Sequence, residues 1–138
     1  MLILRTIINM KKIRKKSKQR ELIYTLVKES KAHPSAIMIY DTLRKKMPTA
    51  SMGNTYRNLK IVVEEKRLNC REYEDGIEHY DAITAPHYHF ICTQCNSIHD
   101  FDIPEQNQII KIAQKKTKNT ITDHTIQFYG VCEICKNK

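Results

Sequence analysis

Two Cys-x-x-Cys pairs constrain this chain more than any other sequence feature. The pairs are Cys92/Cys95 and Cys132/Cys135, and His87-Tyr88-His89 lies just before the first pair. Two residues between cysteines let both sulfurs reach one ion, and two such pairs form the closed four-thiolate shell typical of structural zinc. The segment between the pairs must then hold a strand-helix-strand unit. Four buried or disulfide-bonded cysteines are the alternative.

A second set of possible metal ligands differs in chemistry from the cysteines. If residues 87–92 form a strand, side-chain alternation places His87 and His89 on one face and Cys92 on the other. The histidines then bind a separate ion, and a mixed nitrogen and oxygen set suits iron, manganese, zinc, cobalt or nickel. Ordinary surface polar groups are the competing interpretation. Spacing does not choose the other ligands. The candidates are Asp81, Asp100, Asp102, His33, His79, His99 and His124.

The charge is concentrated in the first part of the chain. Of the 138 residues, 1–83 hold 18 Lys/Arg and 10 Asp/Glu, for a charge of +8, whereas 84–138 hold 6 and 5, for +1. A basic half favours a polyanionic partner, with nucleic acid first. No apolar run approaches the ~18 residues of a membrane span. Free cysteines and the lack of a recognisable leader predict a cytoplasmic protein without a membrane partner.

The basic half has the pattern of a winged helix. A basic cluster at 11–20 is either a solvated tail or an arm that contacts phosphates. Helices are predicted at 17–29, after the cap residue Ser35, and from about Ser51. Strands follow at 68–74 and 77–83, with Asp75-Gly76 as the hairpin turn. Three helices and a two-stranded wing predict a winged helix-turn-helix domain that binds DNA.

The third helix is the predicted recognition helix. Its buried stripe is predicted to be Met52, Tyr56, Leu59 and Val63. Its polar face can contact phosphates and base edges, although a purely structural role for that face is the alternative. The predicted DNA contacts are Lys18, Arg20, Ser51, Asn54, Thr55, Tyr56, Arg57 and Lys60.

The second half is predicted to be a smaller α/β domain. Strands are expected at 87–92, 97–102 and 120–131, with a helix at 104–116. So small a domain buries little core, so zinc and a partner subunit would both stabilise it. The predicted organisation is a DNA-binding domain at 11–83, a hinge at 84–86 and a dimerisation and zinc-binding domain at 87–138. The fold class is α+β.

The chain resembles the ferric uptake regulator (Fur) superfamily of metal-dependent repressors, over about residues 18–136. The resemblance rests on Lys18-Gln19-Arg20, residues 32–36, Tyr56-Arg57-Asn58-Leu59, residues 81–100 and Tyr129-Gly130-Val131-Cys132. Within the superfamily the chain looks most like the peroxide-responsive branch, because iron-sensing relatives tend to carry Glu where this chain has Asp100. Two departures are Gly53 inside the recognition helix and Lys66-Arg67 in place of the Gly usual before the wing.

The resemblance implies specific site residues. It implies one structural zinc per subunit on Cys92, Cys95, Cys132 and Cys135. It also implies one regulatory Fe²⁺ or Mn²⁺ per subunit. The implied regulatory ligands are His33, Asp81, His87, His89 and Asp100.

The resemblance implies a function as well. It implies a homodimer that represses transcription from a palindromic AT-rich operator in double-stranded DNA, takes no small organic substrate and is not an enzyme. Metal-catalysed oxidation of His33 or His87 would open the site and release the DNA.

Other functions stay open. His124 could complete an extra site, so an iron- or zinc-responsive uptake regulator is the main alternative. A metallohydrolase built on His-x-His and two Asp is a remote one, since no general base or nucleophile motif accompanies it. A metal-storage protein or zinc-stabilised adaptor would show no metal-dependent DNA binding.

Overall fold

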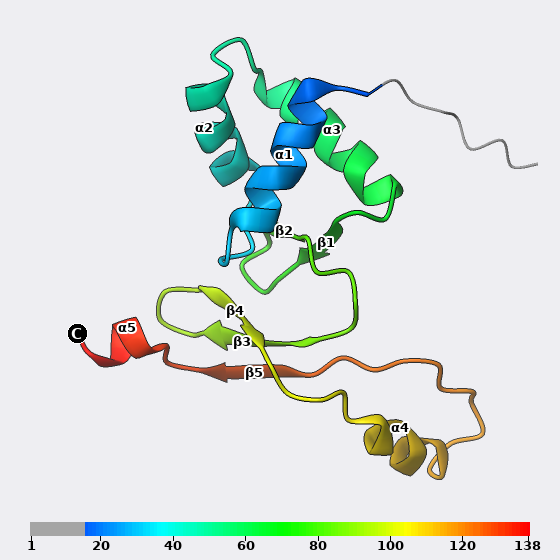
Figure 1. Ribbon diagram of the computed structural model, residues 1–138. Helices are drawn as coiled ribbons and strands as arrows, with labels where there is room; N and C mark the ends of the chain where they lie inside the picture. The colour runs from blue at the N-terminus through cyan, green and yellow to red at the C-terminus, as the bar shows by residue number, and fades with distance from the viewer. Residues whose placement is uncertain (1–15) are drawn as a thin grey trace, which may run out of the picture.

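The computed structural model describes residues 16–138, so the predicted domain start at residue 11 and most of the basic cluster lie outside the described residues. Helices α1 (Lys18–Glu29), α2 (Ala36–Lys46) and α3 (Met52–Glu64) precede a hairpin of β1 (Asn69–Glu72) and β2 (Glu78–Asp81). Figure 1 shows these elements together in the upper part of the molecule. The predicted order of three helices and a two-stranded hairpin is confirmed.

The lower part of the molecule is built on a three-stranded sheet (Figure 1). Strand β3 (Tyr88–Cys92) lies between its antiparallel neighbour β4 (Ile98–Phe101) and its parallel neighbour β5 (Gln127–Gly130). Helix α4 (Asn107–Gln114) lies in the connection from β4 to β5, and α5 (Glu133–Lys136) follows β5. Helices with two small sheets make the fold α+β, as predicted. That the chain folds as separate domains on either side of 84–86 stays a prediction.

Serine side chains cap all three N-terminal helices. Ser17, Ser35 and Ser51 each accept a hydrogen bond from the amide three residues later, at 3.4, 3.4 and 3.1 Å. Such a cap satisfies one of the amides that a helix start leaves unpaired. The Ser35 prediction is confirmed, and α1 begins one residue after Ser17.

None of the helices in the described part of the chain is both long and apolar enough to cross a membrane.

The three helices and the hairpin share one apolar core. Its residues recur three and four positions apart along each helix, because a helix returns to the same face about once per turn. Leu22 and Leu26, predicted on the buried face of α1, are partly buried against this core. The core contains Ile23, Val27, Ala36, Ile39, Leu43, Leu59, Val62, Leu68 and Tyr80.

The buried stripe of α3 differs from the predicted one. Tyr56 is 46% exposed, whereas Thr55 is fully buried. Asn58, which was assigned to the polar face, is also buried. The stripe therefore contains Thr55, Asn58, Leu59 and Val62. Sequence patterning misplaced it because two polar side chains are buried with partners: Thr55 Oγ1 donates to the Ser51 carbonyl at 2.9 Å, and Asn58 donates to Gln19 at 3.3 Å. Thr55 is thus not exposed on the outer face of α3, and its contact with DNA stays a prediction.

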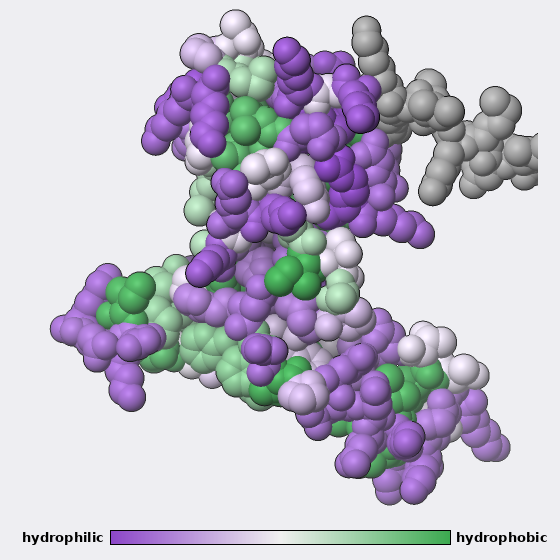
Figure 2. Space-filling view, in the orientation of Figure 1, coloured by the Kyte–Doolittle hydropathy of each residue, from purple (hydrophilic) through white to green (hydrophobic). Residues whose placement is uncertain are grey.

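The second sheet is shorter than predicted. A strand was expected at 120–131, but β5 contains only Gln127–Gly130. These four residues are the ones that pair with His89 to Cys92 of β3. Helix α4 begins at Asn107 instead of 104, and its apolar residues Ile109 and Ile112 are 42% and 61% exposed. Figure 2 shows this hydrophobic surface at the lower right. The apolar side of α4 is therefore not covered by the described part of the chain.

Helix α3 ends in a Schellman motif. The Arg67 amide donates to the Val62 carbonyl at 3.1 Å, and the Lys66 amide donates to the Val63 carbonyl at 2.9 Å. This closure requires a left-handed residue at Lys66, whose φ is 59°. Glycine adopts that conformation without strain, and lysine does not. Arg67 makes two 2.8 Å hydrogen bonds to Glu21, which tie the helix end to α1.

We expect Lys66→Gly to raise the free energy of unfolding by about 0.5–1 kcal/mol, because relief of left-handed strain exceeds the added entropy of the unfolded chain. Urea denaturation followed by circular dichroism measures this change. Lys66→Ala is the matched control, since it removes the charge and keeps the strain. Equal unfolding free energies for the two variants would contradict this explanation.

Candidate metal centres

The four cysteines of the Cys-x-x-Cys pairs converge at one end of the second sheet. Cys92 ends β3, and Cys95 follows in the turn toward β4. Cys132 caps α5, and Cys135 lies within that helix. The second pair comes close to the first because parallel pairing of β3 with β5 places Gly130 beside Cys92. The four sulfur atoms lie within 4.8 Å of one another. The two pairs, distant in sequence, thus form one cluster as the spacing predicted.

Backbone amides adapt this cluster to anionic sulfur. The amides of Cys132 and Cys95 point at the Cys92 sulfur from 3.3 and 3.5 Å. These donors lower the pKa of Cys92 to about 6, so its thiolate is stabilised at neutral pH. The pKa of Cys135 is raised to about 12, first by its hydrogen bond with the Cys132 side chain and by burial, and also by repulsion from the Cys132 sulfur. A cation would relieve that repulsion, and four thiolates are the donor set of a structural zinc site.

We expect the purified protein to hold about one zinc per chain and Cys92→Ser to hold almost none, because a serine hydroxyl does not ionise to replace the thiolate. Inductively coupled plasma mass spectrometry measures the metal content. Cys70→Ser is the matched control, since Cys70 lies on β1 opposite Tyr80 and outside the cluster. Zinc that persists in the Cys92 variant would contradict the assignment.

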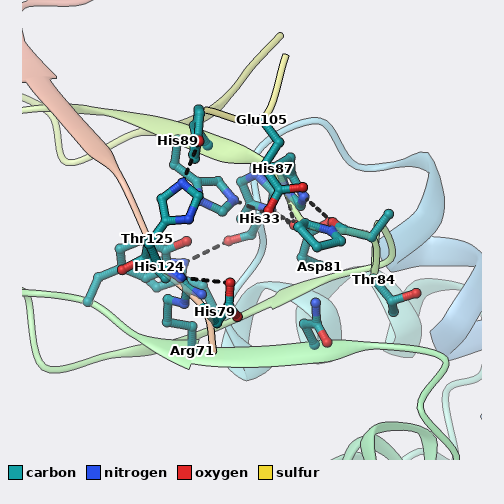
Figure 3. Close-up of a pocket in the computed structure, with 16 residues that line it drawn as sticks. His33, Arg71, His79, Asp81, Thr84, His87, His89, Glu105, His124 and Thr125 are labelled. Carbon is teal, nitrogen blue, oxygen red and sulfur yellow. Dashed lines mark hydrogen bonds and ion pairs between the residues drawn. The ribbon is translucent and has the colours of Figure 1, made fainter. Parts of the chain in front are cut away.

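The five predicted regulatory ligands meet where the upper and lower parts of the molecule join. His33 lies between α1 and α2, and Asp81 ends β2. His87 precedes β3, His89 lies within it, and Asp100 on β4 is directly opposite His89. Figure 3 shows His33, Asp81, His87 and His89 directed toward one another. The structure therefore brings together all five side chains that the resemblance implied.

One oxygen of each carboxylate faces all three imidazoles. Asp100 Oδ1 lies 2.8, 3.1 and 3.7 Å from the Nε2 atoms of His33, His87 and His89, respectively. Asp81 Oδ2 lies 3.5 Å from His33 Nδ1, and 2.8 and 3.6 Å from Nε2 of His87 and His89. Three imidazoles and two carboxylates thus face one another at short distances.

Several of these nitrogens lack a hydrogen-bond partner. His87 Nε2 and both ring nitrogens of His89 are buried without one. His87 Nδ1 lies 2.8 Å from the Ala85 carbonyl, which can only accept, so Nδ1 carries a proton and Nε2 is the nitrogen left for a metal. That nitrogen faces Asp81 Oδ2 at 2.8 Å. Buried imidazole nitrogens without hydrogen-bond partners, beside two carboxylates, are a donor set that fits a divalent metal.

Protonation states in the cluster favour the same conclusion. Burial lowers the pKa of His33, outweighing the attraction of Asp81 and Asp100, so His33 is neutral and can act as a ligand. Burial alone would raise the pKa of Asp81. The close approach of the His89 imidazole, whose Nε2 lies 3.6 Å from Asp81 Oδ2, and the hydrogen bond from the Ile83 amide reverse that effect, and the Asp81 pKa is lowered. A neutral imidazole beside an ionised carboxylate is the state in which both bind metal.

Two candidate ligands lie outside this cluster. His99 is exposed and its ring lies 2.8 Å from the Ser97 hydroxyl. Asp102 is exposed just after β4.

His79 borders the same cavity of about 190 Å³ as the cluster, and its ring contacts the backbone of His33. Its position two residues before Asp81 on β2 was the sequence signal for this proximity.

A third group of possible ligands contains Glu105, Asp123 and His124, with ligand atoms within 4.8 Å of one another. The Tyr88 hydroxyl lies 2.6 Å from His124 Nε2 and accepts from the Gln106 amide at 2.6 Å. Since Gln106 precedes α4, the phenol joins β3 to the start of that helix. His124 Nε2 is therefore hydrogen-bonded, whereas His124 Nδ1 is buried without a partner.

Most predicted DNA contacts are accessible. Tyr56, Arg57 and Lys60 are exposed on α3, and Lys18 is exposed at the start of α1. Arg57 donates to Asn54, one turn earlier. Ser51 is exposed but also caps α3, and Arg20 is half-buried in α1. DNA contact by any of these residues stays a prediction.

Comparison with known proteins identifies the family. The family model described as the ferric uptake regulator family matches residues 11–129. The peroxide-responsive repressor PerR of Staphylococcus aureus is 36% identical over 120 residues, which cover 87% of this chain and 81% of that protein. The chain therefore belongs to the ferric uptake regulator family. It is accordingly a metal-responsive regulator of this family.

Solved structures agree with this placement. The Helicobacter pylori ferric uptake regulator, described as having three functional metal binding sites, is similar with a TM-score of 0.76 and 27% identity. The similarity covers 88% of this chain and 82% of that one. PerR of Streptococcus pyogenes is 29% identical with a TM-score of 0.50, over 90% of this chain and 85% of that one. The expected superfamily resemblance is confirmed.

Proposed function

We propose that the chain is a peroxide-sensing, metal-dependent repressor that binds DNA as a homodimer. The observation that supports this proposal most is the largely buried His/Asp cluster, in which imidazole nitrogens without hydrogen-bond partners converge with two carboxylates. Similarity to PerR of S. aureus supports the peroxide-sensing branch. The His/Asp site is the regulatory one, for Fe²⁺ or Mn²⁺, and the cysteine cluster holds structural zinc.

The regulatory ion would join the two parts of the chain. His33 comes from the helical part, whereas His87, His89 and Asp100 come from the second sheet and the residues before it. A metal that binds this closed arrangement more tightly than an open one shifts the population toward it. A shift from 1:99 to 99:1 requires about 5.5 kcal/mol of differential affinity. Several metal bonds across one junction are an adequate source for this energy.

The closed arrangement would set the spacing of two recognition helices. Exposed Tyr56, Arg57 and Lys60 place the DNA-contacting groups of α3 on its outer face. The uncovered apolar residues of the lower part, including Ile112 and Phe128, are where a second subunit would pack. A symmetric dimer reads half-sites about 34 Å apart or a multiple of that distance. A palindromic AT-rich operator and a cytoplasmic location belong to this proposal.

Peroxide would act by destroying a ligand. Fe²⁺ held by these residues would supply electrons for cleavage of the O–O bond. His33 and His87 lie within 3.1 Å of Asp100 Oδ1, so both rings would lie beside the ion and be open to oxidation there. Overall, one oxygen atom of hydrogen peroxide adds to the imidazole and the other leaves as water. The oxidised ring binds metal poorly, and the closed arrangement and the DNA are both released.

We expect Mn²⁺ to increase operator affinity at least tenfold in the wild-type protein and to have little effect on Asp81→Asn, because the amide removes an anionic ligand. Fluorescence anisotropy on a palindromic AT-rich duplex measures the affinity. Asp102→Asn is the matched control, since it removes a nearby exposed carboxylate that lies outside the cluster. Operator binding that is insensitive to chelation in the wild type would overturn the proposal.

We expect hydrogen peroxide to add a single oxygen atom to His33 or His87 in the Fe²⁺-loaded protein and not in the Mn²⁺-loaded protein. Tryptic mass spectrometry locates the added mass. Asp100→Glu tests the branch, because the longer carboxylate moves the oxygen that faces all three imidazoles. If Asp100→Glu leaves peroxide sensitivity unchanged, or if iron gives no adduct, an iron- or zinc-responsive uptake regulator becomes the better proposal.

A further inference from the structure

The side chain of His79 belongs to neither metal centre, yet both of its ring nitrogens lie within hydrogen-bond distance of a partner. Its Nδ1 lies 2.7 Å from the carbonyl oxygen of His33, and its Nε2 lies 3.0 Å from the Asp75 carboxylate. Both partners are acceptors, so His79 donates to each of them. The ring is 11% exposed and packs edge-on against Tyr73, with centroids 5.4 Å apart. His79 is therefore firmly held between the hairpin turn and His33.

His33 needs such support because its backbone is strained. Its φ is 43°, in the left-handed region that a β-substituted residue adopts at a cost of roughly 1–2 kcal/mol. The imidazole of His33 reaches Asp81 and Asp100 only from this backbone position. The next two residues are also held by β2: the Tyr80 amide donates to the Pro34 carbonyl at 3.0 Å, and Ser35 pairs with His79. Strand β2 thus fixes the loop that presents His33.

The hairpin turn directs its polar groups inward, toward the rest of the protein. Asp75 accepts from His79 with one oxygen and from the Ile77 amide, at 2.9 Å, with the other. Its neighbour Glu74 accepts from the Tyr129 hydroxyl at 2.9 Å, which links the turn to β5. The turn therefore contacts both the His33 loop and the second sheet.

The charge of the hairpin fits an internal role. Residues 69–80 carry one Arg and four Asp/Glu, a net charge of −3 with histidine counted as neutral. Such a segment is repelled by DNA phosphates, unlike the basic first half of the chain as a whole. The wing is accordingly a poor DNA-contacting element, and its turn is available to support the metal site.

We propose that His79, oriented by Asp75, is a positioning residue that holds His33 in its ligand conformation, so that the acidic hairpin sets the metal affinity of the regulatory site. This inference rests on the proposed regulatory function. Removing a group that orients a metal ligand without touching the ion typically weakens metal binding by about 10–100-fold, because the ligand is then no longer held in its binding orientation.

The test is the Mn²⁺ dissociation constant of zinc-replete protein, measured by competition with a fluorescent chelator. We expect His79→Leu to weaken Mn²⁺ binding about tenfold or more, because both hydrogen bonds are lost. His79→Asn should recover most of the affinity, since its amide can still donate to the His33 carbonyl. Zinc content should be unchanged, and operator affinity at saturating Mn²⁺ should return to the wild-type value. Glu72→Gln, an exposed change in the same hairpin, is the control.

The outcomes separate this inference from the proposed function. If wild-type protein binds no Mn²⁺ outside the cysteine cluster, the regulatory proposal fails and the positioning role fails with it. If the wild type binds Mn²⁺ and His79→Leu binds it equally well, only the positioning role is refuted. Should His79→Leu lose zinc through misfolding, Asp75→Asn replaces it, because the amide oxygen can keep the Ile77 turn bond while the carboxylate is removed. Wild-type Mn²⁺ affinity in Asp75→Asn would then refute the role.

Discussion

The junction between the two parts of the molecule depends on a balance of charge. Two carboxylates, Asp81 and Asp100, face three imidazoles in a half-buried space, and water cannot solvate all of these groups there. Leaving buried polar groups without partners costs free energy, and unpaired charges cost more. A divalent cation supplies what the protein groups cannot give one another. In the proposed function, metal occupancy and the relative position of the two parts would therefore be physically linked, which is the requirement for a metal-controlled regulator.

Strand β3 connects the two candidate centres. His89 and Cys92 lie three residues apart on it, so side-chain alternation sends them to opposite faces. The strand is paired on both edges, and the cysteine cluster lies at its end. Zinc at that cluster would keep β3 in register, and β3 is the strand that places His89 opposite Asp100. In the proposed arrangement, the zinc site therefore keeps β3 in a fixed position, and the regulatory site closes against that strand.

Much of the site was predictable from sequence, because short-range rules govern it. Cys-x-x-Cys spacing predicted the sulfur cluster, and alternation separated His87 and His89 from Cys92. The choice of His33, Asp81 and Asp100 from seven candidates came only from the family resemblance, since spacing cannot bring together residues 67 positions apart, such as His33 and Asp100.

The failures have physical causes as well. The face of α3 was misassigned because Thr55 and Asn58 are buried with hydrogen-bond partners, which hydrophobic patterning does not detect. The length of β5 was overestimated because strand propensity does not show where the partner strand ends. The left-handed backbone of His33 had no sequence signal, since it arises from tertiary packing.

The most direct measurement is electron–nuclear double resonance on Mn²⁺-loaded, zinc-replete protein with ¹⁵N-labelled histidine. If one ion joins the helical part to the second sheet, three histidine nitrogens are coupled to Mn²⁺ in the wild type and two remain in His33→Ala. Identical nitrogen coupling in the two proteins would show that His33 is not a ligand, and the ion would then not connect the two parts.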